Sequence, residues 1–219
     1  MAINASQLEQ KSLLRLKRYT FANPIAAAAN AIVTAIDPSS GATVGTALTQ
    51  AAAFATTVTF RHARRATLVL TDASAGAGGL SVSVRIAGHR FGVPQSEILT
   101  VTCTDGSATT GTSTLCYDAI SSIVPSALTS TGAGDTLTMG ISADLGLPFP
   151  IEIVTDVTRA VKIVSGNVET IIAISSTTVD VTRSMLVHGT VITKANDVFE
   201  VEFLVSRTLP MFGNSGAFA

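Results

Sequence analysis

The sequence predicts an all-β chain built from antiparallel sheets. Apolar and polar residues alternate with a period of two in several short segments after about residue 56. Clusters of Gly, Ser, Thr and Asp separate these segments at roughly even spacing, and no segment after the N-terminal part has the 3.6-residue period of a helix. This combination is typical of sandwiches and barrels. We therefore expect an antiparallel β-sandwich, immunoglobulin-like or jelly-roll-like, with an N-terminal helical arm and an extended C-terminal tail.

Residues 1–45 predict an arm that contains a short helix over residues 6–17. Ser6-Gln7-Leu8-Glu9 has the spacing of a capping box, and cations gather towards the other end, where they suit the helix dipole. So short a helix cannot bury its leucines alone, so we expect it to dock on this domain or on a neighbouring subunit. The interface candidates on the arm are Leu8, Leu13, Leu14, Arg15, Leu16 and Arg18.

Residues 46–207 predict the sandwich itself. Apolar residues alternate with polar ones over 80–86, 99–103, 137–141 and 199–205, and such alternation indicates strands with one buried face. Residues 208–219 are apolar, contain glycine and carry no charge, so they predict a tail that lies on another surface. The interface candidates on this tail are Pro210, Met211 and Phe212.

The composition favours a subunit of an assembly over a solitary monomer. Charged residues make up 13% of the 219 residues, where a soluble domain has about 25%, and the mean hydropathy is +0.47. No run of about 18 apolar residues is present, and the N-terminal stretch lacks the pattern of a signal peptide, so no membrane partner is expected. We infer that partner molecules cover much of the surface, and we expect the chain to self-associate.

Several classes of function lack their usual signals. A net charge of −1 does not suit a binder of polyanions, so no nucleic-acid partner is expected. The three His and two Cys are scattered, which predicts no metal site and no cofactor. No Gly-x-Ser-x-Gly motif occurs, and Asp180 with Glu200 or Glu202 fits a solvated strand face better than a glycosidase pair. We expect no enzymatic activity.

The sharpest charge cluster is Arg61-His62-Ala63-Arg64-Arg65. Three interpretations stay open for Arg61, Arg64 and Arg65. They form a solvated entry to a strand, or an electrostatic contact with an acidic neighbouring subunit, or a contact with packaged DNA. The same three interpretations stay open for the basic end of the arm, residues 15–18.

Seven segments occur in a characteristic order between residues 67 and 150. They are Thr67-Leu68-Val69-Leu70-Thr71, Val84-Arg85-Ile86-Ala87-Gly88-His89-Arg90-Phe91-Gly92, Glu97-Ile98-Leu99-Thr100, Gly111-Thr112, Ile120-Ser121-Ser122-Ile123, Gly134-Asp135-Thr136-Leu137-Thr138-Met139-Gly140 and Leu145-Gly146-Leu147-Pro148. This order resembles a family of β-rich structural proteins in the virions of tailed bacteriophages. The chain departs from the family pattern at His89 and Arg90, where small polar or acidic residues are usual.

The resemblance implies a structural virion protein that assembles in the cytoplasm of a bacterial host. We expect a capsid decoration or cement protein that binds the outer head surface and bridges capsomers. Its partners would be the major capsid protein and further copies of itself, as a homotrimer in preference to a dimer. Two alternatives stay open: a tail or fibre component that contacts the host surface, and a virion-associated polysaccharide hydrolase with a carboxylate pair in a groove.

The two cysteines, Cys103 and Cys116, flank a Gly- and Thr-rich connection over residues 104–115. If the flanking strands form a hairpin, the two side chains face each other at a separation that a disulfide can span. A bacterial cytoplasm keeps thiols reduced. We therefore expect a reduced pair on adjacent strands that binds no metal, with a disulfide bridge as the alternative.

Overall fold

The computed structural model describes residues 14–22, 27–49, 58–73, 79–129, 132–164, 168–187 and 198–206. These residues form antiparallel strands and one 3-10 turn, η2 (Val154–Asp156). None of the described residues belongs to a helix long and apolar enough to cross a membrane. The prediction of an all-β chain with antiparallel sheets is confirmed.

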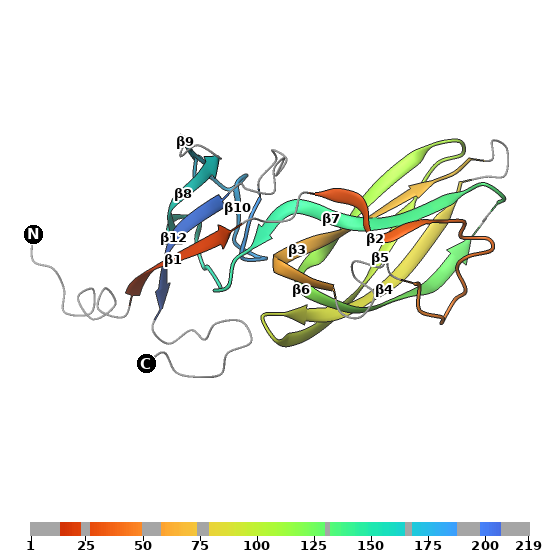
Figure 1. The fold of residues 1–219 in the computed structure, drawn as a ribbon, viewed down its shortest axis with the longest axis horizontal. Helices are drawn as coiled ribbons and strands as arrows, with labels where there is room; N and C mark the ends of the chain where they lie inside the picture. The colour runs from red at the N-terminus through yellow and green to blue at the C-terminus, as the bar shows by residue number, and fades with distance from the viewer. Residues whose placement is uncertain are drawn as a thin grey trace, which may run out of the picture. The chain divides into compact units, whose positions relative to one another are not determined.

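The chain forms two compact units (Figure 1). The continuous unit comprises residues 27–143, and the split unit comprises residues 1–26 together with residues 144–219. The chain passes between the units twice, first between residues 26 and 27 and then inside the strand β7 (Thr136–Gly146). This division differs from the predicted arm over 1–45 and single domain over 46–207, because strands from the predicted arm take part in the sheets of both units.

The split unit is built on a four-stranded antiparallel sheet. Its strands, in spatial order, are β1 (Leu14–Ala22), β12 (Val198–Ser206), β8 (Val157–Val164) and β9 (Val168–Ile171). Two short strands, β10 (Val179–Asp180) and β11 (Met185–Leu186), pair with each other, and β11 pairs with the end of β7.

Large aromatic side chains fill the core of the split unit. The alternation in β12 buries Phe199, Val201 and Phe203, while the intervening Glu200 and Glu202 remain partly exposed. The rings of Phe149 and Phe203 lie 5.3 Å apart between centroids. The two-residue period that predicted β12 therefore places its apolar side chains in the core of the split unit.

The expected helix over residues 6–17 is wrong at its C-terminal end. Residues 14–17 belong to β1, and residues 6–13 lie outside the described part of the chain. Strand β1 pairs with β12 without a register shift, from Leu14 opposite Ser206 to Ala22 opposite Val198. These hydrogen bonds and the burial of Phe21 outweigh the local helix signals, since local propensity is weak against tertiary context.

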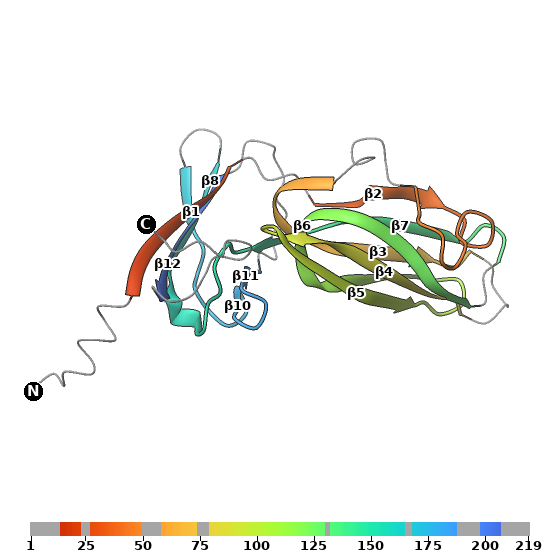
Figure 2. The same cartoon turned by 90° about the horizontal axis from the view of Figure 1, so that it is seen from below.

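The described residues of the continuous unit form six strands. They are β2 (Ala28–Ile36), β3 (Val58–Thr71), β4 (Ser81–Arg90), β5 (Val93–Thr102), β6 (Ala108–Thr129) and the first part of β7. The spatial order is β7, β3, β6, β4 and β5, and β2 pairs with β7. Figure 2 shows β4 and β5 beside each other beneath the long curved strand β6.

Strand β6 is 22 residues long and serves two partners. It pairs with β3 from Ala108 to Ile120 and with β4 from Ala119 to Thr129, so the two pairings overlap at Ala119 and Ile120. The sheet curls at this change of partner, so that β5 lies against the first half of β6: a Cβ atom on Gly111 would overlap the side chain of Val101. A single long strand therefore joins both sides of the curled sheet.

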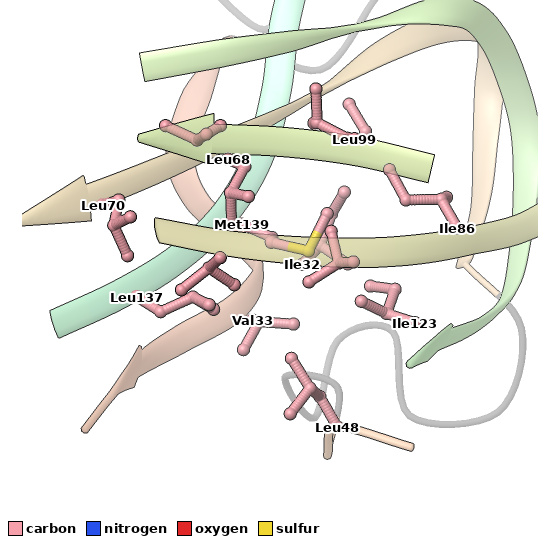
Figure 3. Close-up of a cluster of buried hydrophobic side chains, with 14 of the residues drawn as sticks. Ile32, Val33, Leu48, Leu68, Leu70, Ile86, Leu99, Ile123, Leu137 and Met139 are labelled. Atoms are coloured by element: carbon pink, nitrogen blue, oxygen red, sulfur yellow. The ribbon is translucent and has the colours of Figure 1, made fainter. Parts of the chain in front are cut away.

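Aliphatic side chains fill the space inside this curl (Figure 3). Leu68 and Leu70 of β3, Ile86 of β4 and Met139 of β7 are fully buried there, and Leu99 of β5 is 9% exposed. The alternation predicted for residues 80–86, 99–103 and 137–141 places its apolar members in this core, which confirms these strand predictions.

Two glycines allow strands to approach more closely than any other residue would permit. A Cβ atom on Gly140 of β7 would overlap the carbonyl of Ala28 in β2, and one on Gly88 of β4 would overlap the carbonyl of Ala119 in β6. Both neighbours are backbone atoms, which cannot swing aside as a side chain does. These glycines therefore belong to the packing of the sheet.

Candidate functional site

Arg64 of the arginine cluster on β3 is buried in the interior, and Arg65 is half-buried. Arg64 is 1% exposed and donates to the carbonyl of Ser142, and Arg65 donates to the carbonyl of Ser113. His62 is 7% exposed. The burial of Arg64 corrects the expectation that this residue forms a solvated strand entry or a contact surface, because its guanidinium group binds a carbonyl of β7 in the interior. Arg65 is half-buried and binds a carbonyl of β6, and its expected contact stays a prediction. The side chain of Arg61 lies outside the described part.

The predicted interface residues of the arm are divided between β1 and the part of the chain outside the described residues. Leu16 is 60% exposed. Arg18 donates to a carboxylate oxygen of Glu202, with Nε to Oε1 at 2.9 Å, and Arg159 approaches Glu200 and Glu202 at 3.9 and 4.0 Å. Leu14 and Arg15 lie on β1, but their side chains are not described. The remaining candidates, Leu8, Leu13, Pro210, Met211 and Phe212, fall outside the described residues.

Both cysteines are free and buried. Cys116 lies on β6 opposite Arg65 of β3, whereas Cys103 directly follows β5. Strands β5 and β6 are not neighbours in the sheet, because β4 lies between them and pairs with both. The expected hairpin between the two cysteines is therefore wrong. Within the described residues, no three His, Cys, Asp or Glu side chains gather in a way that could hold a metal ion.

A polar network holds the bend of β6. The carboxylate of Glu97 on β5 accepts from the backbone N–H groups of Thr114 at 2.8 Å and Leu115 at 3.1 Å, and from the hydroxyl of Tyr117 at 3.0 Å. The side chain of Gln95 donates to the carbonyl of Cys116. Burial, and then the charge of Glu97, raise the pKa of Tyr117, so its hydroxyl stays protonated. These side chains satisfy backbone groups where β6 changes partner, which is a structural role.

A second polar group stabilises the turn between β4 and β5. Phe91 adopts a left-handed backbone conformation with φ 49°, and its N–H donates to the Asp118 carboxylate at 2.7 Å. Burial raises the pKa of Asp118, while this hydrogen bond opposes the shift. Burial also lowers the pKa of the neighbouring Arg90. The carboxylate fixes a strained turn residue, since a non-glycine residue rarely adopts a positive φ.

A hollow in the described surface lies on the outer face of β4, β5 and β6. Its volume is about 470 Å³, and it is lined by Arg85, Ala87, Gly88, His89, Pro94, Gln95, Ser96 and Ser121. Arg85, Ala87 and His89 share the outer face of β4, since side chains alternate along a strand. The register places Ser96 opposite Ala87, so short side chains form the floor between Arg85 and His89.

An irregularity in β6 adds Ser121 to this hollow. The β4–β6 register passes from Ala87 opposite Ser122 to Gly88 opposite Ile120, so Ser121 is the extra residue of a β-bulge. Its hydroxyl donates to the carbonyl of Ala87 at 3.1 Å. A bulge turns a side chain out of the regular alternation and is often found beside functional sites. The presence of Ser121 in the hollow therefore results from the register between β4 and β6.

The lining of the hollow favours a negatively charged ligand. It contains one arginine, one histidine and two serines, and it contains no carboxylate. Arg85 is exposed, and no hydrogen bond or ion pair joins its guanidinium to another described residue. Sequence reasoning missed this site because Ala, Gly, Ser and Pro carry little chemical signal. The one available signal was His89, a departure from the family pattern.

Comparison of the chain with protein-family models, with curated proteins and with solved structures finds no match. The resemblance to a family of virion proteins therefore remains a prediction from the sequence. The function has to be argued from the geometry of the described residues.

Proposed function

We propose that the chain is a structural virion protein, a capsid decoration protein that binds the outer surface of a phage head and bridges capsomers. The observation that carries this proposal is the exposed edge strand β9. This strand is at one end of the four-stranded sheet, and its Ile171 is 79% exposed. An edge strand offers unpaired backbone groups to a strand of another chain, and an exposed isoleucine gains free energy when a partner covers it.

The opposite edge of that sheet is less suited to strand addition. Strand β1 carries Arg15, Lys17 and Arg18, and cationic side chains on an edge discourage pairing with another sheet. Strand β9 carries a single charged residue, Glu169, in its four-residue sequence. We therefore assign β9 to the contact with the major capsid protein, which would add a strand beside it.

The continuous unit provides the body of the proposed decoration protein. We interpret its curled sheet as a β-sandwich in which β5 and the first half of β6 face each other across an apolar core. Its two sides share β6, which would resist their separation under load. The low content of charged residues, 13% of the chain, supports a surface that is covered by neighbours, and we propose a homotrimer in preference to a dimer.

Binding to expanded heads tests this proposal. We expect Ile171→Lys to abolish co-sedimentation of the full chain with heads, because a charge would have to be buried at the contact. Thr170→Lys is the matched control, since Thr170 is an exposed neighbour on the same strand whose side chain points to the other face. Equal binding of the Ile171→Lys variant and the unaltered chain would contradict the proposal. A stable monomer in light scattering at micromolar concentration would contradict the trimer.

The second candidate is a tail or fibre component that contacts the host surface. The polar hollow on β4, β5 and β6 favours it, because a decoration protein does not need such a site. A low-resolution image of the particle distinguishes the candidates by the position of the subunit on the head or the tail. The hydrolase alternative needs a carboxylate pair in a groove, and the lining of the hollow supplies none.

A further inference from the structure

We propose that the hollow on the outer face of β4, β5 and β6 binds an acidic saccharide through the sugar's carboxylate group. This inference does not rest on the decoration function, because the hollow lies on the continuous unit and the proposed capsid contact lies on β9 of the split unit.

The depth of the site follows from three cross-strand rows. Ile98 of β5 lies opposite Arg85 of β4, Ser96 lies opposite Ala87, and Pro94 lies opposite His89. The middle row has short side chains, whereas the two outer rows have long or bulky ones. The result is a slot that crosses the strands, with Arg85 at one wall and His89 at the other. Its volume of about 470 Å³ is within the usual range of small-molecule sites, about 300–1,000 Å³.

Arg85 is the residue that selects the charge of the ligand. A guanidinium binds a carboxylate through two parallel hydrogen bonds, which adds direction to the electrostatic attraction. Arg85 is exposed and makes no hydrogen bond or ion pair with any other residue that the structure describes, so no internal contact must break when a ligand binds. No carboxylate is among the lining residues. The Asp118 carboxylate, outside the lining, interacts electrostatically with His89, so Arg85 and not His89 carries the attraction for an anion.

The other polar residues of the lining favour an anion that also carries several hydroxyl groups over an anion without them. Ser96 and Ser121 present hydroxyl oxygens on the floor. The Ser121 hydroxyl donates to the carbonyl of Ala87 and retains its lone pairs for a sugar hydroxyl. His89 supplies a further ring nitrogen at the far wall. No Phe, Tyr or Trp is among the eight lining residues, so a neutral sugar lacks the large ring on which sugars usually stack, and the charge of Arg85 becomes the main source of affinity.

Titration of the full chain with glucuronate tests this inference, followed by amide chemical shifts in NMR spectra. We expect glucuronate to shift the amides of Ala87, Ser96 and Ser121, and to bind at least about tenfold more tightly than glucose, since a charge-assisted pair is lost with the neutral sugar. Arg85→Gln should remove this preference. Arg18→Gln, a change of an exposed arginine in the split unit, should leave it unchanged.

A second pair of variants tests the shape of the site. Ser96→Phe places a ring on the floor of the slot and should abolish the glucuronate shifts. Thr100→Phe is the matched control, because Thr100 lies on the same exposed face of β5, outside the lining, and it should retain the shifts. Three results would overturn the proposal: equal affinity for glucose and glucuronate, unchanged binding in Arg85→Gln, or inorganic phosphate or an oligoglutamate peptide binding as tightly as glucuronate.

Discussion

The two units of the chain reach the same strand architecture with different side chains. Among the described residues, the core of the split unit contains four phenylalanines, Phe21, Phe149, Phe199 and Phe203. The core of the continuous unit is almost entirely aliphatic, and Tyr117 is the one aromatic residue among its fully buried members in the described sequence. The sheet of the split unit has four strands, so a few large rings fill a small interior. The larger curled sheet distributes its packing over many branched side chains.

Their outer faces differ in a corresponding way. On the split unit, Arg18 and Arg159 lie across the sheet from Glu200 and Glu202 and form ion pairs. On the continuous unit, hydroxyl groups pair across β4 and β5, with Ser83 Oγ and Thr100 Oγ1 at 2.7 Å. The first face depends on charge and is screened by salt, whereas the second does not. The stability of the two units should therefore respond differently to the same perturbation.

The largest expected effect comes from truncating one core at a time. Phe203→Ala should destabilise the split unit by about 3–5 kcal/mol, and Leu68→Ala should destabilise the continuous unit by about 2–5 kcal/mol, because each leaves a cavity in a fully buried site. Calorimetry should show two unfolding transitions, and each substitution should lower the midpoint temperature of a different one. A single transition whose midpoint temperature falls equally with both substitutions would show that the two cores unfold together.

A smaller loss is expected from removing the carboxylate at the bend of β6. Glu97→Ala deprives two backbone N–H groups and the Tyr117 hydroxyl of their acceptor, so the continuous unit should lose about 2–3 kcal/mol. Urea unfolding measures this loss. Glu152→Ala, at an exposed glutamate, is the control and should change the midpoint little. A loss for Glu97→Ala no larger than the control's would mean that water satisfies these groups.

The pH dependence of the continuous unit should contain a contribution from Asp118. Burial raises the pKa of Asp118 from its ordinary value of 3.8, so the folded state retains this proton to higher pH than the unfolded state. The contribution is therefore fully present below pH 3.8 and is lost as the pH rises through the folded pKa. Asp118→Asn stays neutral, so its melting temperature relative to the unaltered chain should rise between pH 3 and pH 7. A difference that stays constant over this range would contradict the assignment.

The smallest effect is expected at the charged outer face of the split unit. Arg18 has a 59% exposed side chain, and exposed ion pairs contribute at most about 1 kcal/mol. Arg18→Gln should therefore lower the stability slightly at low salt and not at all near 1 M salt. Ser83→Ala removes a hydroxyl pair instead, and its effect should be the same at both salt concentrations. If the stability changes of the two variants depended equally on salt, the outer faces of the two units would not differ in their dependence on charge.

The strands were predictable where burial of one face alone sets the alternation of apolar and polar residues. Leu80, Val82, Val84 and Ile86 alternate with polar residues and are all fully buried, because a half-buried strand imposes that period directly. The N-terminal strand was not predictable from its surroundings. Its partner β12 lies far along the chain, with Arg18 beside Glu202, 184 positions later, while a nearby capping-box pattern favoured a helix.

The polar features of the structure were harder to anticipate. Glu97 was recognised as part of a motif, but its role depends on β6 changing partners within one continuous strand. The hollow depends on a one-residue bulge at Ser121. A change of partner and a bulge are properties of the register between distant strands, and alternation within one segment carries no information about them.

The division of the split unit along the sequence has a consequence for the order of folding during synthesis. The continuous unit is contiguous, and its β4–β5 hairpin and neighbouring β6 can pair as soon as they leave the ribosome. Strand β1 is made first but must wait for β12, and at about 5–20 residues per second the 184 positions between Arg18 and Glu202 correspond to roughly 10–40 s. Throughout this interval β12, the described partner of β1, has not yet been made. We expect the nascent chain to carry a finished unit while its first described strand is still open to chaperones and to other nascent chains.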